Sequence, residues 1–478
     1  MEERTGPSGK STSMTWTIGS IVEASGGRLT TGNPEQAAGR ISTDTRNMAK
    51  EDCFVALSGE NHDGHSFVME AISRGASVIV VESGRLPDAF RSNSHATAVI
   101  EVPDTLYALG ELARRWRSRF GIQVVGVTGS NGKTGTKELV AGMLGQRRRV
   151  LKNRGNFNNL IGVPLTLLEL EPGHEAAVVE LGINVPGEMA RLVEISSPTV
   201  GIITNVHPAH LEGLQSLDRI VEEKGKLWLS LARDDLAVVN LDDERLRNFA
   251  RNLHARSVTY SMENPSADVA PAGPPISRAD GVSFPLRLGK EIVEVHASLF
   301  GIHQVQNAVA AAAAVWAMGE PAEVIVSGLA AHVPVRQRMQ VHRLDDGRIV
   351  VDDAYNANPG SMKAALKAVG TASGGGPFIA VLGDMRELGP DSAALHREVG
   401  RRLKASGVTR LITLGDASRH IAEGAVESGF DREACRHAVN HEEAAGWLTK
   451  EQVGNAWILV KGSRAMAMEK VVERILKE

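Results

Sequence analysis

The stretch that decides the fold is residues 122–144, which read IQVVGVTGSNGKTGTKELVAGML. Its beginning, 122–127, is mostly apolar and β-branched, which predicts a buried strand that stops at a glycine loop. Apolar residues then return at helical spacing, at Leu139, Val140, Met143 and Leu144. A strand, a glycine loop and a helix in this order are typical of a loop that binds phosphate groups.

The loop carries the residue types that phosphate binding needs. Gly129 and Gly132 let the backbone turn tightly enough to aim its N–H groups at phosphate oxygens. A helix beginning near Lys133 adds the positive end of its dipole; Lys133 would reach the β- and γ-phosphates, and Thr134 would place a hydroxyl on Mg²⁺. The common loop has a further glycine where this chain has Val127, so the match is to a shorter variant. The alternative is an ordinary glycine turn.

The composition excludes several classes of protein. With 478 residues, 42% hydrophobic and 23% charged, the chain is long enough for about three domains. A net charge of −4 gives no bias toward nucleic acid or anionic membrane, so neither is expected as a partner. Cys53 and Cys435 form neither a disulfide framework nor a metal cluster and fit a reducing compartment. Without a secretory segment or an apolar run as long as a membrane span, we predict a cytoplasmic protein.

Alternating strand and helix patterns predict an α/β fold of three domains. Residues 1–13 are polar and predict a disordered tail. A mixed α/β domain is expected at 14–120, and a central domain with a mostly parallel sheet around the phosphate loop at 121–334. Residues 335–478 predict a Rossmann-like domain without a nucleotide fingerprint of its own.

Polar residues of the N-terminal domain gather in loops beside two expected strands, at 53–57 and 77–81. They are Asp44, Arg46, Ser58, Asp63, Gly64 and His65. Loops of this composition often hold a polar ligand, but turn chemistry and surface ion pairs explain them as readily.

In the central domain, expected strands at 176–179 and 200–204 lead to Glu180 and to the loop NVHPAHLEG, which contains His207 and His210. Ligands of open parallel sheets bind beyond the carboxyl ends of the strands, so these side chains could face the same phosphates as the glycine loop. A carboxylate and an imidazole there could hold a cation that bridges to the nucleotide. The alternative is that each histidine is a structural loop residue.

Two further segments complete the central domain. Residues 262–281 are rich in Pro, Gly and Ala and predict an exposed loop before alternating strands at 282–299. Residues 301–319 predict a strong helix, with His303 and Asn307 on one face of its start. They could meet a nucleotide base there or simply cap the helix.

Four expected strands of the last third end in polar loops, within 348–359, 378–389, 411–416 and 456–466. Because carboxyl ends of parallel strands share one edge, these loops describe the rim of a binding crevice. The rim residues are Asp352, Asp353, Tyr355, Asn356, Asn358, Asp384, Lys461, Ser463 and Arg464. Structural turns could explain any one of them.

Nine motifs, in order along nearly the whole chain, resemble the Mur ligase family. They are TGSNGKT (128–134), RGNFNNLIGVP (154–164), ELG (180–182), NVHPAHLEG (205–213), HQVQNAVAA (303–311), VRQRMQ (335–340), DDAYNANPGSM (352–362), LGDMRELG (382–389) with His396 downstream, and KGSRAMAME (461–469). The resemblance implies an N-terminal domain that holds a UDP-sugar, a central ATPase, and a C-terminal domain that closes over ATP and binds the incoming amino compound. DDAYNANP and KGSRAM are most similar to the branch that adds D-alanyl-D-alanine to UDP-N-acetylmuramoyl-tripeptide.

The resemblance also implies the chemistry. The terminal carboxylate of the tripeptide attacks the γ-phosphate of ATP, the amine of D-alanyl-D-alanine attacks the resulting acyl phosphate, and phosphate leaves. ATP and two Mg²⁺ ions are the implied cofactors, the partners are small molecules, and we expect a monomer. Positioning and charge neutralisation should supply most of the rate.

Residue roles follow from the same resemblance. ATP would be held by Thr128, Gly129, Ser130, Asn131, Gly132, Lys133 and Thr134, by Asn307 at the adenine, and by Arg338 and Asp353 from the C-terminal domain. Thr134 would hold one Mg²⁺, and Glu180 with His210 the second. The implied catalytic residues are Lys133, Glu180, His210 and Lys224. Lys224 matches a lysine that some relatives carry as a carbamate, and Lys226 lies nearby.

Substrate contacts are implied as well. The UDP-muramoyl peptide would meet Thr45 or Arg46 together with Asn156, Asn158 and Asn159, although TDTR at 43–46 departs from the D-S-R common in relatives. The dipeptide would meet Asn356, Asn358 and Arg464.

Two other functions stay open. One is a related Mur ligase or a folylpolyglutamate synthase that adds a single amino acid; DDAYNANP argues against it, because such relatives carry a loop of D-Y-A-H-x-P type. The other is a nucleotide-dependent switch protein, which would need no polar rim on its third domain.

Overall fold

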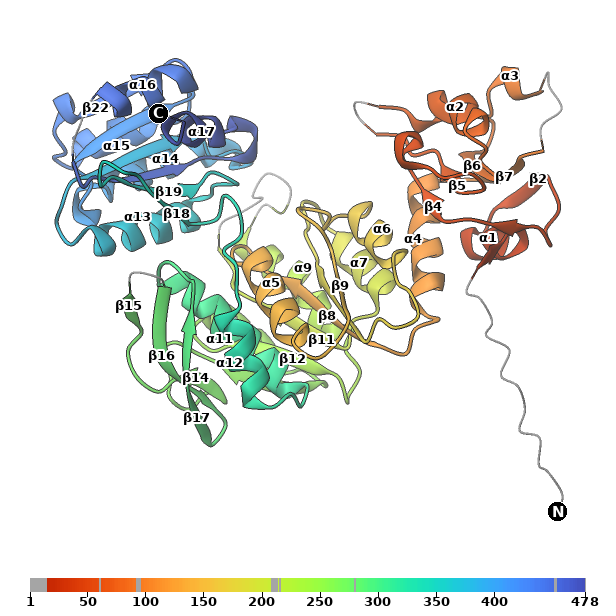
Figure 1. Cartoon of the computed structure of the whole chain (residues 1–478), viewed down its shortest axis with the longest axis horizontal. Helices are drawn as coiled ribbons and strands as arrows, with labels where there is room; N and C mark the ends of the chain where they lie inside the picture. The colour runs from red at the N-terminus through yellow and green to blue at the C-terminus, as the bar shows by residue number, and fades with distance from the viewer. Residues whose placement is uncertain are drawn as a thin grey trace. The chain divides into compact units, whose positions relative to one another are not determined.

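The glycine loop follows a strand of the largest sheet that the described residues form (Figure 1). The structure is a computed structural model that describes residues 15–59, 62–91, 96–207, 214, 216–278, 281–450 and 454–477. The tail expected at 1–13 and the candidate ligand His210 therefore lie outside the described residues.

The central sheet has ten strands in the order β15-β16-β14-β13-β12-β11-β8-β10-β9, with β17 paired to β16. They are β8 (Gln123–Thr128), β9 (Val150–Lys152), β10 (Ala176–Glu180), β11 (Val200–Ile203), β12 (Leu236–Asn240), β13 (Arg256–Tyr260), β14 (Val269–Pro271), β15 (Ile276–Arg278), β16 (Gly281–Leu288) and β17 (Glu291–Ala297). Neighbours from β9 to β14 are parallel, and β16 is antiparallel to its partners. The mostly parallel sheet predicted around the loop is confirmed.

Strand β8 stands where the direction of the strand order reverses. The chain places β9 and β10 on one side of β8 and β11 on the other. In open α/β sheets the crevice at such a switch point is the usual ligand site, because the loops on its two sides diverge there. The glycine loop that follows β8 therefore lies at this switch point.

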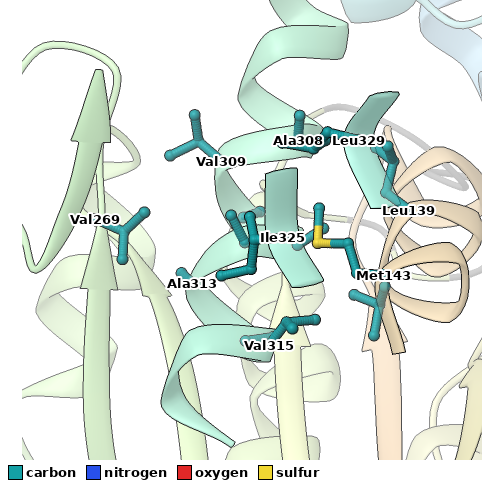
Figure 2. Close-up of a cluster of buried hydrophobic side chains, with 14 of the residues drawn as sticks. Leu139, Met143, Val269, Ala308, Val309, Ala313, Val315, Ile325 and Leu329 are labelled. Atoms are coloured by element: carbon teal, nitrogen blue, oxygen red, sulfur yellow. The ribbon is translucent and has the colours of Figure 1, made fainter. Parts of the chain in front are cut away.

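Helices cover both faces of the central sheet. On one face, α5 (Lys133–Leu144) packs with α11 (Ile302–Ala317) and α12 (Ala322–Ala330), and Figure 2 shows their side chains meeting in one apolar cluster. On the other face α9 (Leu217–Leu229) lies against the sheet, because a Cβ added to Gly126 would stand 3.1 Å from Leu227 Cδ1. Two further helices among the described residues are α7 (Glu188–Ser196) and α10 (Glu244–Ala250).

One segment differs from the sequence expectation. Residues 262–281, expected as an exposed loop, contain β14 and β15. Both strands are short, and they form because β16 offers them a ladder: Val269 pairs with Leu288, and Ile276 with Ser283. Such pairing depends on the partner strand more than on local composition, which is why the prediction of a loop was wrong here.

The last third of the chain forms a separate six-stranded sheet in the order β18-β19-β23-β20-β21-β22. Its strands are β18 (Gln340–Arg343), β19 (Ile349–Asp353), β20 (Phe378–Gly383), β21 (Arg410–Leu414), β22 (Cys435–Ala438) and β23 (Trp457–Lys461), and its helices are α13 (Pro359–Ser373), α14 (Ser392–Arg401), α15 (Arg419–Glu427), α16 (His441–Lys450) and α17 (Glu469–Ile475). The four strands predicted from polar loops, β19, β23, β20 and β21, are parallel neighbours. Their carboxyl ends therefore share one edge, as expected.

The N-terminal part has a five-stranded sheet in the order β2-β7-β6-β5-β4. Its strands are β2 (Arg28–Thr31), β4 (Ile41–Ser42), β5 (Cys53–Val55), β6 (Val78–Glu82) and β7 (Ala98–Val102), β1 (Trp16–Thr17) pairs separately with β3 (Ala37–Ala38), and the helices are α1 (Ile18–Ser25), α2 (Val68–Ser73), α3 (Asp88–Arg91) and α4 (Thr105–Arg117). A later helix, α6 (Gly162–Leu167), joins them: the indole N–H of Trp116 on α4 donates to Leu170 O at 2.9 Å, just past α6.

The chain divides into two compact units. The first comprises Met1–Gly121, Arg154–Pro172 and Glu194–Ser197, and the second comprises the remainder, including both larger sheets. The segment 154–172 thus folds with the N-terminal part although it lies between β9 and β10 in sequence. The domain boundaries expected after residues 13, 120 and 334 stay predictions. Among the described residues, no helix has the length and apolar character needed to cross a membrane.

Candidate active site

The glycine loop after β8 has a backbone that only glycine fits. Gly129 has φ +143° and Gly132 has φ +82°. A Cβ at Gly129 would lie 1.9 Å from Thr204 Oγ1, and one at Gly132 would lie 2.3 Å from Asn307 Oδ1. Both glycines therefore satisfy a steric demand as well as a conformational one.

The loop is held from the side by the residues that follow β11. Ser130 N donates to Asn205 O, and Asn131 N donates to Asn205 Oδ1, each at 2.9 Å. Ser130 Oγ donates to His207 O and accepts from His207 N, both at 2.9 Å. His207 thus supports the loop through its backbone, while burial lowers the pKa of its imidazole. Asn205 was missed by sequence reasoning, although its place directly after a strand beside the loop was the available signal.

Lys133 lies over the loop at the start of α5. Its Nζ donates to Gly129 O at 2.9 Å and to Ser130 O at 3.3 Å. Burial lowers the pKa of the Lys133 ammonium, and the positive charge of Arg338 adds to that, while Glu180 opposes it. The ammonium therefore caps the loop at the point where a bound phosphate would sit.

Thr134 and Glu180 meet beside it. Thr134 Oγ1 donates to Glu180 Oε2 at 2.6 Å, and both side chains are buried. The meeting follows from register, because Glu180, the last residue of β10, pairs with Val127 of β8, one residue before the end of that strand. Thr128 completes the strand end and donates from Oγ1 to Leu181 O at 2.7 Å.

Lys224 of α9 approaches Lys133 and Glu180 from the opposite face of the central sheet. Its side chain is buried, and its pKa is lowered well below the ordinary value, first by burial and then by the positive charge of Lys133, against the attraction of Glu223 and Glu180. Lys226, two residues on, instead forms an ion pair with Glu223 and is partly exposed. Of these two lysines, Lys224 is therefore the one in electrostatic contact with Lys133 and Glu180.

The oxygens of Thr134 and Glu180 fit a magnesium ion. Mg²⁺ is usually held by one or two carboxylates together with phosphate oxygens and water, and a hydroxyl beside a carboxylate at the end of a phosphate loop is such a set. Within the described part of the chain, no cluster of three His, Cys, Asp or Glu side chains could hold a metal by itself. His210 cannot be placed in the set, since it is outside the described residues.

Asn307 and the residues of VRQRMQ reach the loop from other elements. The Asn307 amide packs on the loop and the first turn of α5: a Cβ at Gly135 would lie 3.2 Å from its Nδ2. Arg338, whose charge acts on Lys133, stacks over the Tyr355 ring with its Cζ 4.0 Å from the ring centroid. These placements bring both side chains toward the glycine loop.

Asp353, which was expected to reach ATP, has both carboxylate oxygens bound by groups of the protein. Asp353 Oδ1 accepts from Met339 N at 3.1 Å, and its other oxygen forms an ion pair with Lys461. His303 lies close enough to both to feel their charges, and burial lowers the pKa of its imidazole to about 4. Asp353 thus fixes the backbone beside Arg338, in a pair with the lysine that ends β23.

The three residues assigned to the dipeptide occupy different positions. Asn358 caps α13 through its side-chain oxygen, and its Nδ2 donates to Asn131 Oδ1 in the glycine loop at 2.8 Å. Asn356 Oδ1 accepts from Ala357 N at 2.9 Å. Arg464 is exposed and pairs with Glu469 at 2.7 Å. Asn358 is therefore the one that the structure brings to the phosphate loop.

The residues assigned to the UDP-peptide all lie in the N-terminal unit. Thr45 is buried, whereas Arg46 is exposed and makes two hydrogen bonds to the Asp44 carboxylate, at 2.9 and 2.8 Å, which lower the pKa of that carboxyl. Asn158 N donates to Asn156 O at 2.7 Å, and Asn159 Oδ1 accepts from Gly162 N at 2.9 Å at the start of α6.

A second polar group in this unit combines a predicted cluster with a missed residue. Arg85 donates to Ser58 Oγ at 2.7 Å and pairs with Asp63 at 2.5 Å. Asp63 also holds His65 Nδ1 at 2.9 Å, and His65 Nε2 accepts from Glu82 N at 3.0 Å. The sequence grouped Ser58, Asp63 and His65 but gave no reason to add Arg85, which comes after the next strand.

Asp352 gives a pH-dependent prediction. It is buried at the end of β19, and burial raises its pKa from 3.8 to about 6, with Asp353 adding to the shift and the Ala354 N–H opposing it. When folding raises the pKa of a carboxyl, the ionised group destabilises the folded state above its folded-state pKa. Below the unfolded-state pKa the group is protonated in both states and has no such effect. Asp352→Asn should therefore raise the free energy of unfolding by about 2 kcal/mol at pH 8, and the gain should vanish toward pH 4.

Urea unfolding of the two proteins at both pH values measures this. Asp346→Asn is the matched control, because its hydrogen bonds to Arg348 lower the pKa of that exposed carboxyl and predict a small change of opposite sign at pH 8. An equal gain for Asp352→Asn at both pH values would assign the effect to packing instead of charge.

Comparisons with known proteins agree with this geometry. Family models match the Mur ligase family catalytic domain at 39–117, the Mur ligase middle domain at 127–315 and the Mur ligase glutamate ligase domain at 337–464. The UDP-N-acetylmuramoyl-tripeptide–D-alanyl-D-alanine ligase of Escherichia coli (strain K12) is 36% identical, over 92% of this chain and 93% of that one.

Solved structures give the same result. MurF from Acinetobacter baumannii superposes with a TM-score of 0.87 at 30% identity, covering 97% of this chain and 99% of that chain. MurF ligase from Thermotoga maritima in complex with ADP superposes with 0.79 at 28% identity, covering 92% and 97%. The chain belongs to the Mur ligase family, and it is an ATP-dependent ligase with the three-domain α/β fold predicted from its motifs. Within the family, this relative and these two solved structures are MurF ligases.

Proposed function

We propose that this chain joins D-alanyl-D-alanine to UDP-N-acetylmuramoyl-tripeptide at the expense of ATP, a step of peptidoglycan precursor synthesis. The observation that carries the proposal is the meeting of Lys133, Thr134 and Glu180 at the switch point of the central sheet. Two relatives that align with 92% and 96% of the chain bear the name of this activity.

The chemistry asks the protein mainly for position and charge. The tripeptide carboxylate attacks the γ-phosphorus, ADP leaves, and the amine of the dipeptide then attacks the acyl phosphate, from which phosphate departs. Lys133 would neutralise charge on the transferred phosphoryl group, and the loop N–H groups would orient it. Arg338, Asp353 and Asn307 would hold the rest of the nucleotide, with Asn307 at the adenine.

Magnesium and a modified lysine belong to the same proposal. Thr134 would hold one Mg²⁺ at the phosphates, and Glu180 with His210 would hold a second ion beside it; the metal supplies charge neutralisation when bound. Lys224 would act as a carbamate. Its burial next to Lys133 and Glu180 supports that choice over Lys226, whose amine is already paired.

The remaining assignments complete the proposal. Thr45 or Arg46 and the asparagines Asn156, Asn158 and Asn159 would hold the UDP-muramoyl peptide, which is consistent with their all folding in the N-terminal unit. Asn356, Asn358 and Arg464 would face the dipeptide. We further propose that the enzyme works as a monomer in the cytoplasm.

The test is phosphate release from ATP with Mg²⁺ and UDP-N-acetylmuramoyl-tripeptide, with D-alanyl-D-alanine present, absent, or replaced by single amino acids. Release that requires both the UDP-peptide and the dipeptide, with ADP formed in step, is the expected result. Release with a single amino acid would move the assignment to a related ligase, and release indifferent to the UDP-peptide would point to a nucleotide switch.

A further inference from the structure

A fully buried lysine, Lys137, lies one helical turn beyond Thr134 on α5. Its side chain is 0% exposed, and it is among the largest fully buried side chains described. Nζ donates to the backbone oxygen of Asn153 at 2.7 Å and pairs with the Glu138 carboxylate at 2.9 Å. Nothing in the phosphate-binding role of the loop explains this lysine.

Asn153 stands at the point where the chain leaves the central sheet. It follows β9 directly, and the next residue begins the segment 154–172 that folds with the N-terminal unit. Because its backbone oxygen turns to Lys137, its side chain continues the ladder toward β10: Oδ1 accepts from Glu180 N at 2.9 Å, and Nδ2 donates to Glu180 O at 3.4 Å. The amide of Asn153 thus holds the backbone of Glu180 on both sides.

Together with the Thr134–Glu180 hydrogen bond, these contacts form a closed ring of interactions between helix α5 and the end of strand β10. Helix α5 carries both Thr134 and Lys137. From Lys137 the ring runs through Asn153 to the Glu180 backbone, and the Glu180 carboxylate returns to Thr134 Oγ1 at 2.6 Å. The ring fixes how far the Thr134 hydroxyl stands from the Glu180 carboxylate.

We propose that Lys137 is a positioning residue which, through Asn153, sets the Glu180 carboxylate against Thr134 and so tunes the affinity of the site for the magnesium that accompanies the nucleotide. The inference rests on the proposed role of Glu180. Partners that orient a metal-binding carboxylate commonly change metal affinity or activity by about ten- to a hundredfold when removed.

A purely structural role makes a different prediction. Buried ion pairs can often be replaced by apolar side chains of similar volume without loss of stability. Glu138 would keep a partner in this variant, because it also pairs with Lys152. In the wild type, its bonds to Lys152 and Lys137 lower its pKa, although burial alone would raise it. Lys137→Met also takes the donor away from the buried Asn153 oxygen, so the variant should fold with a somewhat lower Tm, and a purely structural role would predict that loss of stability without a change in the Mg²⁺ response.

The test measures ADP binding by calorimetry at stepped Mg²⁺ concentrations, and ligase turnover in the same series. For Lys137→Met we expect the Mg²⁺ concentration for half-maximal effect to rise about tenfold, kcat to fall about ten- to a hundredfold, and ADP affinity in excess EDTA to stay as in the wild type. Lys152→Met is the control; it removes the exposed partner of Glu138 and should leave the Mg²⁺ response unchanged.

Asn153→Ala tests the same link from its other end. If Lys137 acts through Asn153, the double variant should be no worse than the more impaired single variant. Additive losses, an unchanged Mg²⁺ response in either variant, or equal weakening of ADP binding with and without Mg²⁺ would overturn the proposal. The wild-type substrate test above is independent of all these variants, so failure of the ligase assignment would be seen separately.

Discussion

Lys133→Ala should lower ligase turnover by about a thousandfold, because it removes the ammonium that lies over the loop proposed to hold the γ-phosphate. Within the described residues, the ammonium donates to two loop carbonyls, Gly129 O and Ser130 O. Hydrogen bonds of this kind contribute about 1 kcal/mol each, and the variant no longer buries a cation, so Tm should change little.

Steady-state phosphate release and thermal unfolding of the same preparations check both halves of this expectation. Lys290→Ala, at the exposed turn between β16 and β17, removes the same charge far from the loop in sequence and should leave turnover unchanged. A large fall in Tm with a proportionate fall in activity would mean that Lys133 holds the loop together and is not reserved for phosphate.

The sequence predicted the position of Lys133 because the prediction used only neighbouring residues and the geometry of parallel strands. A doubly buried strand, a glycine loop and an amphipathic helix specify β8, the loop and α5 from residues 122–144 alone. The approach of Glu180 to Thr134 then follows from the rule that parallel strands end at one edge, which the register of β8 and β10 confirms.

What the sequence did not predict depends on partners that are distant along the chain. Lys137 shares a helical face with Val140 and Leu144, but its contact with the Asn153 oxygen depends on how the chain turns away after β9. The short strands β14 and β15 need β16 beside them. Asn358, assigned to the dipeptide, accepts a hydrogen bond at the start of α13 with its side-chain oxygen and donates from Nδ2 to Asn131. Asn131 and Asn358 are 227 residues apart in sequence.

Lys224 could have been separated from Lys226 by periodicity. The buried positions of α9 include Ile220, Leu227 and Trp228, and Lys224 follows Ile220 by four residues on the same face. Lys226 lies off that face and pairs with Glu223. A lysine within an apolar helical stripe is a candidate for chemistry that needs a neutral amine, because burial disfavours its charged form.

Lys224→Ala should lower turnover by at least about a hundredfold if a carbamate at this position supports the magnesium site. Carbamylation joins the neutral amine nitrogen to the carbon of CO₂; one C=O bond becomes a carboxylate, and the nitrogen loses a proton to solvent. The pKa of Lys224 is lowered by burial and by Lys133, so the neutral amine is present nearer neutral pH than for an ordinary lysine.

The sign of the pH dependence follows directly. As pH falls, the amine gains a proton, the carbamate is lost and activity should fall; added bicarbonate should restore it in the wild type and not in Lys224→Ala. Carbon-13 bicarbonate should give a carbamate signal in the wild type and in the matched control Lys226→Ala, which should keep its turnover. If Lys224→Ala stayed active, Lys224 would have no part in the reaction. If the variant lost its activity while wild-type activity were indifferent to the removal of dissolved CO₂, the buried amine itself, which interacts electrostatically with Lys133 and Glu180, would be the functional group.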